Sequence, residues 1–193
     1  MHLLKRFYIG LALLLLGLTH ASAQNDLAGN TVLVIRHAEK PSEALHSPLL
    51  TEQGEQRAQA YVRYFQPFDD DGTRLHVTAL YAGADSRDSS RPRLTLEPLS
   101  KASGIPLDST IRTKDPERLV LVLRTHPHGK VPLICWRHGQ IPALLTAFGA
   151  DPKTLLPHGE WPDEVFDWVL VLHFDAQGKM RSEQLIHEPP MVQ

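Results

Sequence analysis

The sequence has little cysteine, no excess of charge of one sign and no hydrophobic run of membrane-spanning length. Cys135 is the single cysteine among 193 residues, which excludes an internal disulfide. It lies in the apolar run VPLICW, so we interpret it as a small buried hydrophobic side chain rather than a reactive thiol. Stability must therefore come from a hydrophobic core, and a chain of this length can bury one as a single domain.

The charged residues nearly balance. Lysine and arginine number 20, aspartate and glutamate number 22, and the formal net charge is -2. Without a basic excess or a basic run, the sequence argues against nucleic acid as a partner.

The first residues read as a targeting segment rather than as part of the fold. Lys5 and Arg6 precede an apolar run from 9 to 18, and small residues (ASA) stand at 21–23. The run is shorter than the roughly 20 residues of a membrane span, and the pattern is typical of a secretory signal peptide. We predict a signal peptide in 1–23 cleaved near Ala23, and one domain in 24–193. We then expect a periplasmic or secreted protein without stable membrane association; a retained N-terminal anchor is the alternative.

Strand-like and helix-like segments alternate along the rest of the chain. Buried strands are predicted at 31–36, 75–83 and 131–137, helices at 51–65, 90–104, 115–126 and 140–149, and a hairpin at 164–188 around the turn DAQGK. This order predicts an α/β three-layer sandwich, with a largely parallel central sheet, helices on both faces and an antiparallel edge near the C-terminus.

Two arginine–histidine pairs end predicted strands. Arg36-His37 follows the run TVLVI, and Arg137-His138 follows VPLICW. In open α/β sheets ligands bind beyond the carboxyl ends of the strands, so we expect both pairs at one crevice. A neutral imidazole can accept a phosphoryl group, and the planar fork of arginine matches phosphate oxygens. The residue types therefore favour phosphoryl transfer, with a further arginine (Arg87, Arg91 or Arg93) after the second strand.

Four segments in order resemble the histidine phosphatase superfamily, which has the phosphoglycerate-mutase-like fold. They are VLVIRHAEK, LLTEQGEQRAQA, SSRPRLTLEPL and ICWRHGQI, and the resemblance extends from Thr31 to about Phe174. The first matches the family's Arg-His-Gly motif with Ala38 in place of glycine. The third resembles Arg-x-x-Gln-Thr, which selects Arg91 over Arg93 and aligns Thr95.

The resemblance implies a metal-independent phosphomonoesterase. We expect the segments between Gly104 and Lys130 and between Gly149 and Val165 to form the pocket walls, and their short length suggests a small phosphorylated molecule as the substrate. His37 would become phosphohistidine while Arg36, Arg91 and His138 hold the phosphoryl oxygens, and water would then release phosphate. Neither a metal ion nor an organic cofactor is implied. A protonated His138 would favour phosphate binding, whereas His37 must stay neutral.

Two departures from the family pattern concern the pocket. Ala38 adds a methyl group, which the backbone accepts where φ is negative. Leu94 replaces the usual glutamine and removes one possible hydrogen bond.

The general acid has several candidates. Asp115 is the nearest match to the carboxylate of the mutase branch, although it also suits the N-cap before Pro116. Glu39 and Glu160 are the others, and Glu39 could instead orient an arginine or pair with Lys40.

Other readings remain open from sequence. One is a catalytically weak relative that binds a phosphorylated envelope sugar or lipid headgroup; a less favoured one is a phosphomutase. We interpret His126 and His128 as solvated loop residues rather than chelators, and Asp69–Asp71 as a turn rather than a calcium loop. The sequence does not predict the oligomeric state.

Overall fold

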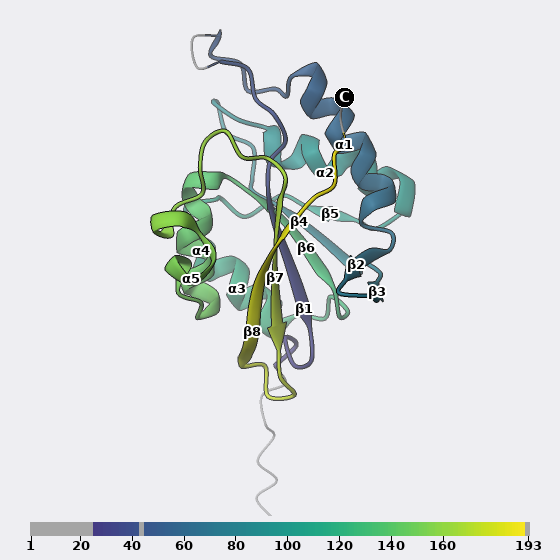
Figure 1. Cartoon of the computed structure of the whole chain (residues 1–193), viewed down its shortest axis with the longest axis vertical. Coiled ribbons are helices and arrows are strands. Elements are labelled where there is room, and N and C mark those ends of the chain that lie inside the picture. Colours follow the sequence, from purple (N-terminus) through teal and green to yellow (C-terminus); the bar gives the residue numbers. More distant parts are fainter. Residues whose placement is uncertain (1–24, 43–44, 192–193) are drawn as a thin grey trace, which may run out of the picture.

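The computed structural model describes residues 25–42 and 45–191, so the predicted signal peptide lies outside the described residues. A six-stranded sheet forms the middle layer, with helices on both faces (Figure 1). The strands are β1 (Thr31–Arg36), β2 (Phe68–Asp70), β3 (Thr73–Leu75), β4 (Ala79–Ala82), β5 (Leu107–Asp108), β6 (Pro132–Trp136), β7 (Trp168–Phe174) and β8 (Met180–His187). The helices are α1 (Glu52–Tyr64), α2 (Arg91–Ser103), α3 (Pro116–Thr125), α4 (Ile141–Phe148) and α5 (Pro152–Leu155).

The sheet has the strand order β5-β4-β6-β1-β7-β8. The first four of these strands are parallel, whereas β7 pairs antiparallel with both β1 and β8. This confirms the predicted α/β fold with a largely parallel sheet and an antiparallel part near the C-terminus. The antiparallel part begins inside the sheet, because β7 lies directly beside β1.

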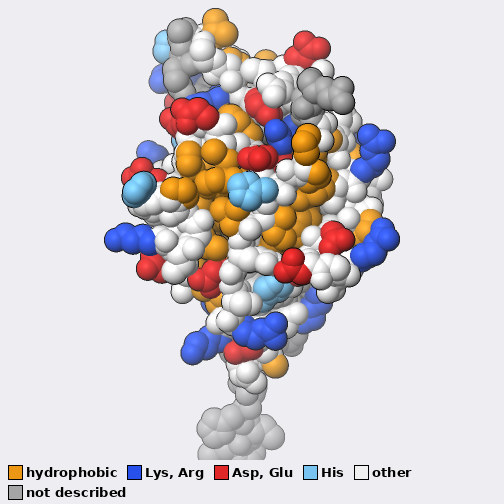
Figure 2. Space-filling view, viewed as in Figure 1, with side chains coloured by type: hydrophobic (Ala, Val, Ile, Leu, Met, Phe, Trp, Pro, Cys, Tyr) orange, Lys and Arg blue, Asp and Glu red, His pale blue; other side chains and the backbone are white. Residues whose placement is uncertain are grey.

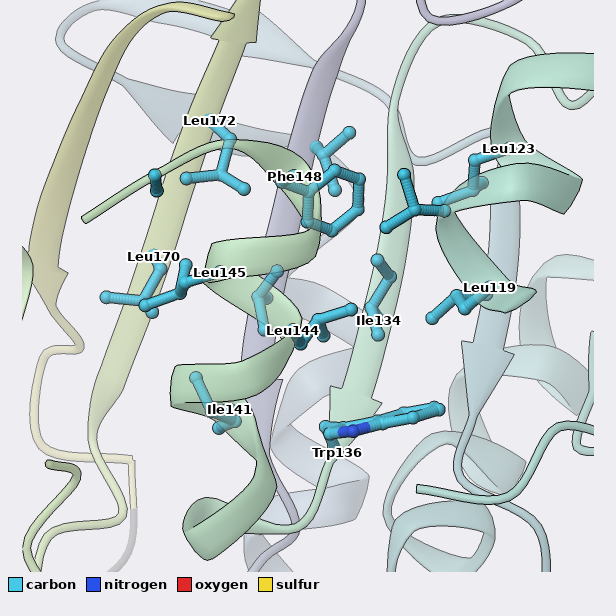
Figure 3. Close-up of a cluster of buried hydrophobic side chains, with 14 of the residues drawn as sticks. Leu119, Leu123, Ile134, Trp136, Ile141, Leu144, Leu145, Phe148, Leu170 and Leu172 are labelled. Atoms are coloured by element: carbon cyan, nitrogen blue, oxygen red, sulfur yellow. The ribbon is translucent and has the colours of Figure 1, made fainter. Parts of the chain in front are cut away.

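Each face of the sheet buries its own set of apolar side chains. On one face, residues from β1, β6 and β7 pack against α3 and α4, including Ile134, Leu144, Phe148 and Leu170 (Figure 3). On the other face, Ile35, Leu133 and Val171 pack against the aromatic and leucine side chains of α1 and α2. Alternate residues of a strand point to opposite faces, so a strand covered on both sides is apolar throughout. This is why the predicted strands read as continuous hydrophobic runs.

The helix ends follow the expected chemistry. The Thr51 side chain accepts a hydrogen bond from the Gly54 amide at 3.1 Å, and Gly104 and Gly149 adopt positive φ after α2 and α4. Asp115 stands at the N-cap position of α3, but its side chain makes no capping hydrogen bond.

Two local predictions are wrong. The segment 75–83 is not one strand, because β3 ends at Leu75 and β4 begins at Ala79. Asp69–Asp71 is not simply a solvated turn, because Asp70 ends β2 of a small hairpin and is buried. The Gln184 side chain donates to Asp70 at 2.7 Å, which ties this hairpin to β8.

Strand β8 forms one end of the sheet, with β7 as its hydrogen-bonded neighbour. In the view of Figure 2, hydrophobic side chains gather near the middle of the face, and charged side chains lie around them. Leu185 and Ile186 of β8 are partly buried apolar residues packed against the two cores. In the part of the chain that the structure describes, no helix has the length and apolar character needed to cross a membrane.

Candidate active site

The two arginine–histidine pairs meet at one edge of the sheet. Strands β1 and β6 are parallel neighbours with Arg36 opposite Trp136, so the residues that follow them emerge together. The His37 amide continues the ladder by donating to the Trp136 carbonyl at 3.0 Å. The ring centroids of His37 and His138 are 6.2 Å apart, at an interplanar angle of 77°. The convergence predicted from strand direction is therefore present.

His37 is held as a neutral imidazole. Its ring is almost fully buried, and Nδ1 lies 2.8 Å from the Ala38 carbonyl, which can only accept a hydrogen bond. Nδ1 therefore carries the hydrogen and Nε2 keeps its lone pair. Burial, aided by the positive charges of Arg36 and Arg91, lowers the pKa of His37 to about 3. At neutral pH this histidine is an uncharged imidazole with a lone pair on Nε2 rather than a cation.

The backbone after His37 is fixed by α2. The Ala38 amide donates to Thr95 Oγ1 at 2.9 Å, and the Thr95 hydroxyl donates to the Arg91 carbonyl at 2.8 Å. Ala38 is fully buried beside Leu50 and Ala58, and its backbone φ is not positive. The alanine is thus compatible with this backbone. Leu94, which stands where the family usually has glutamine, packs against the same apolar cluster. An apolar contact therefore takes the place of the hydrogen bond that a glutamine could make.

Arg36 holds the loop of residues 162–166. Its Nη1 donates to the carbonyls of Pro162, Asp163 and Val165 at 3.0, 2.8 and 2.7 Å. The guanidinium also lies 3.8 Å from the centroid of the Phe166 ring, a cation–π contact. Burial lowers the pKa of Arg36 to about 10, so it stays charged at neutral pH.

Part of the Arg36 guanidinium still faces the candidate site. Nη2 is 3.4 Å from Nδ1 of His138, and Nε is buried without a hydrogen-bond partner among the described residues. A buried donor left without a partner is unfavourable, so this edge of the guanidinium suits an incoming acceptor such as a phosphoryl oxygen.

Arg91 is the first residue of α2. It is buried, its Nη1 donates to the Ser47 carbonyl at 2.7 Å, and its charge contributes to the lowered pKa of His37. Arg93 instead points toward solvent and pairs with Asp85 at 2.9 Å. The positive charge of Arg91 acts on His37, and Arg91 stays the arginine that the motif predicts for the phosphate.

His138 is paired with a carboxylate that the sequence did not single out. Its Nε2 lies 2.6 Å from Oδ1 of Asp163, and its Nδ1 faces Arg36. Because a guanidinium only donates, Nδ1 accepts and Nε2–H donates to Asp163. Burial and then the charge of Arg36 lower the pKa of His138, an effect that Asp163 opposes. Protonation of His138 therefore needs a more acidic solution than a free imidazole does.

A hollow of about 850 Å³ opens beside His138 and Asp163. Its wall comes from the segment between Gly149 and Val165, as predicted, and includes His158, Glu160 and Trp161. The segment between Gly104 and Lys130, predicted as a second wall, supplies none of its lining residues. No local motif marks Asp163, which lies in an irregular loop; its distance from His138 depends on how that loop folds back.

Neither Asp115 nor Glu39 is placed as an acid at this site. Asp115 pairs with Arg112 at 3.0 Å and contacts neither histidine. Both oxygens of Glu39 accept from Arg57, at 2.8 to 3.1 Å, so Glu39 orients an arginine. Arg57 also donates to Glu188 at 2.6 Å. No local sequence pattern indicates this buried network, because Glu188 lies 131 positions from Arg57.

The two loop histidines do not form a metal site. His126 is exposed and bonded to Thr125, whereas His128 is buried with Nε2 donating to the Leu123 carbonyl at 2.7 Å. The interpretation of His128 as a solvated residue is therefore wrong. Among residues 25–42 and 45–191, no three histidine, cysteine or carboxylate side chains are grouped so as to hold a metal ion.

Comparisons with known proteins agree on the fold. No protein-family model and no curated protein matches the sequence. Solved structures of histidine phosphatases and of phosphoglycerate mutase do match, and the chain therefore has the fold of the histidine phosphatase superfamily.

Three of these structures illustrate the likeness. A candidate phosphohistidine phosphatase, SixA from Agrobacterium tumefaciens, is 18% identical, covers 81% of this chain and 96% of its own, and has a TM-score of 0.52. A candidate α-ribazole-5′-P phosphatase from Escherichia coli is 12% identical, with coverage of 84% and 98% and a TM-score of 0.53. The phosphoglycerate mutase of Plasmodium falciparum is 14% identical, with coverage of 86% and 92% and a TM-score of 0.51.

Proposed function

We propose that this protein is a phosphomonoesterase that transfers a phosphoryl group to His37 and then to water. The observation that carries the proposal is the state of His37. This histidine is 2% exposed, its Nδ1–H is held by the Ala38 carbonyl, and Nε2 has no hydrogen-bond partner among the described residues. A histidine with a purely structural role does not require an unpaired ring nitrogen beside two arginines and a second histidine. A nucleophilic histidine does require such a free lone pair.

The surrounding donors suit the phosphoryl oxygens. Arg36 offers Nε and Nη2, Arg91 lies close enough to influence the charge of His37, and His138 offers Nε2–H. Preorganised donors of this kind stabilise the charge that moves onto the oxygens as the ester bond breaks. The mechanism needs no metal ion, because the arginines supply the positive charge.

Hydrolysis fits the site better than a mutase reaction. A mutase must shield its phosphoenzyme from water, whereas the hollow next to His138 is open and the Asp163 side chain is 65% exposed. The volume of about 850 Å³ suits a small phosphomonoester. We further propose that the protein is exported, on the strength of the pattern in residues 1–23.

The test uses residues 24–193 and p-nitrophenyl phosphate in the presence of a chelator, with His37→Ala beside the wild type. We expect turnover by the wild type, acid-labile phosphate on the quenched protein, and loss of both in the variant. Wild-type turnover by His37→Ala, or a strict requirement for an added divalent metal, would overturn the proposal. Tight binding of phosphate by a folded wild type without any turnover would favour the ligand-binding alternative.

A further inference from the structure

Asp163 lies where a phosphoryl-transfer site needs a proton donor. Its Oδ1 is 2.6 Å from Nε2 of His138, and its side chain borders the hollow in which a leaving group would fit. Of the carboxylates in the described ranges, Asp163 is the one that contacts either site histidine. Of the three candidates from sequence, Asp115 pairs with Arg112 and Glu39 pairs with Arg57. The third, Glu160, lines the hollow but contacts neither histidine.

We propose that Asp163 is the general acid that protonates the leaving oxygen, and the general base of the second step. This inference rests on the proposed phosphatase function, because it supplies the acid that the motifs did not identify.

The carboxyl is anchored by the groups that define the site. Arg36 binds the Asp163 carbonyl at 2.8 Å, and the carbonyls of Pro162 and Val165 on either side. The Trp161 indole donates to the same Val165 carbonyl at 2.9 Å. The arginine beside the phosphoryl site thus also fixes the backbone that carries the acid. A catalytic group held through its own backbone keeps its geometry relative to the substrate.

The position of Asp163 also suits the direction in which the leaving group would depart. In a phosphoryl transfer the attacking and leaving atoms lie roughly in line through phosphorus. His37 is buried and does not line the hollow, so an ester attacked by its Nε2 would extend its leaving group outward. Asp163 stands on that outer side. A phosphoryl oxygen that takes the hydrogen bond from His138 would release Asp163 toward the leaving oxygen.

The proton balance closes in two steps. In the first, Nε2 of His37 forms a bond to phosphorus, the ester P–O bond breaks, and the carboxyl proton of Asp163 moves to the leaving oxygen. In the second, water attacks phosphorus and gives a proton to the Asp163 carboxylate, the P–N bond breaks, and His37 returns to its neutral form. The proton that Asp163 gives to the leaving oxygen in the first step is replaced by the proton it takes from water in the second, so the cycle leaves Asp163 unchanged.

The test compares leaving groups. Asp163→Asn is assayed with phenyl phosphate, whose leaving oxygen needs a proton, and with 2,4-dinitrophenyl phosphate, whose leaving group departs without one. We expect kcat/KM to fall by about 10²- to 10⁴-fold on phenyl phosphate and to stay within about threefold on 2,4-dinitrophenyl phosphate. The variant should also accumulate phosphohistidine, because the second step lacks its base. Glu164→Gln is the matched control; it removes the neighbouring exposed charge and should retain activity on both substrates.

Each other outcome counts against the proposal. An equal loss on both substrates would assign Asp163 a structural role. Unchanged or increased activity would show that Asp163 hinders the access of phosphate to His138 and does not act as the acid. If the wild type forms no phosphohistidine even with 2,4-dinitrophenyl phosphate, the proposed function itself fails. A wild-type phosphoenzyme together with an unaltered leaving-group dependence in Asp163→Asn would reject the acid alone.

Discussion

At the scale of the residue, burial decides what the two site histidines can do. Both have a lowered pKa, with loss of solvent as the largest cause, and His37 lies deeper than His138. The effect is unfavourable for folding in acid, because the unfolded chain protonates these imidazoles at a higher pH than the folded chain does. The burial that keeps these imidazoles neutral therefore lowers the stability of the folded state in acid.

The buried His37 predicts a specific loss of stability in acid. Its pKa is about 3 in the folded protein and 6.5 ordinarily, so between these values the unfolded state binds more protons and stability falls as the pH falls. At pH 5 the cost is about 2 kcal/mol. Urea unfolding should show that His37→Asn loses less stability than the wild type from pH 7 to pH 5. Parallel losses in the two proteins would contradict the assigned burial of a neutral imidazole.

At the scale of the element, the start of α1 packs against the backbone of the segment that follows His37. The Thr51 amide donates to the Glu39 carbonyl at 3.0 Å, and the Thr51 side chain caps the helix. Gly54 allows this contact, because a Cβ at that position would lie 2.5 Å from the Glu39 carbonyl oxygen. The glycine of the LTEQGEQ segment thus serves a close approach of two backbones rather than an unusual φ.

Gly54→Ala should therefore separate α1 from the segment after His37. The added methyl group meets backbone that cannot rotate away, and overpacking of this kind costs about 1–3 kcal/mol. We expect a lower midpoint of urea unfolding. We also expect a reduced kcat, because a displaced Glu39 backbone would move the residues next to His37. Gln56→Ala, at an exposed position of the same helix, is the control. Unchanged stability and activity in Gly54→Ala would show that the contact is looser than the structure indicates.

At the scale of the whole molecule, one buried arginine joins three distant segments. Arg57 of α1 binds Glu39, two residues after His37, and Glu188, which follows β8. The Tyr61 hydroxyl also donates to Glu188 at 2.8 Å. The segment after β8 is in this way attached to α1, beside which it runs in Figure 1.

Removing Arg57 should be far more damaging than removing an exposed arginine. Arg57→Met would leave two buried carboxylates without their cation, a change that costs about 3–5 kcal/mol. We expect a correspondingly lower free energy of unfolding in urea. Arg63→Met, at an exposed position of α1, should change stability by less than about 0.5 kcal/mol. Similar stabilities for the two variants would refute the importance of the network.

The sequence by itself determined the fold class and the strands that end in Arg36-His37 and Arg137-His138. These depend on hydrophobic periodicity and on residues that follow one another in the chain, so local pattern suffices to predict them. Only the tertiary structure decided that Asp163 reaches His138, that Arg36 holds the 162–166 loop, and that Glu39 belongs to Arg57. Such contacts depend on the path of irregular loops and on segments up to 131 positions apart, for which the spacing of residues carries no signal.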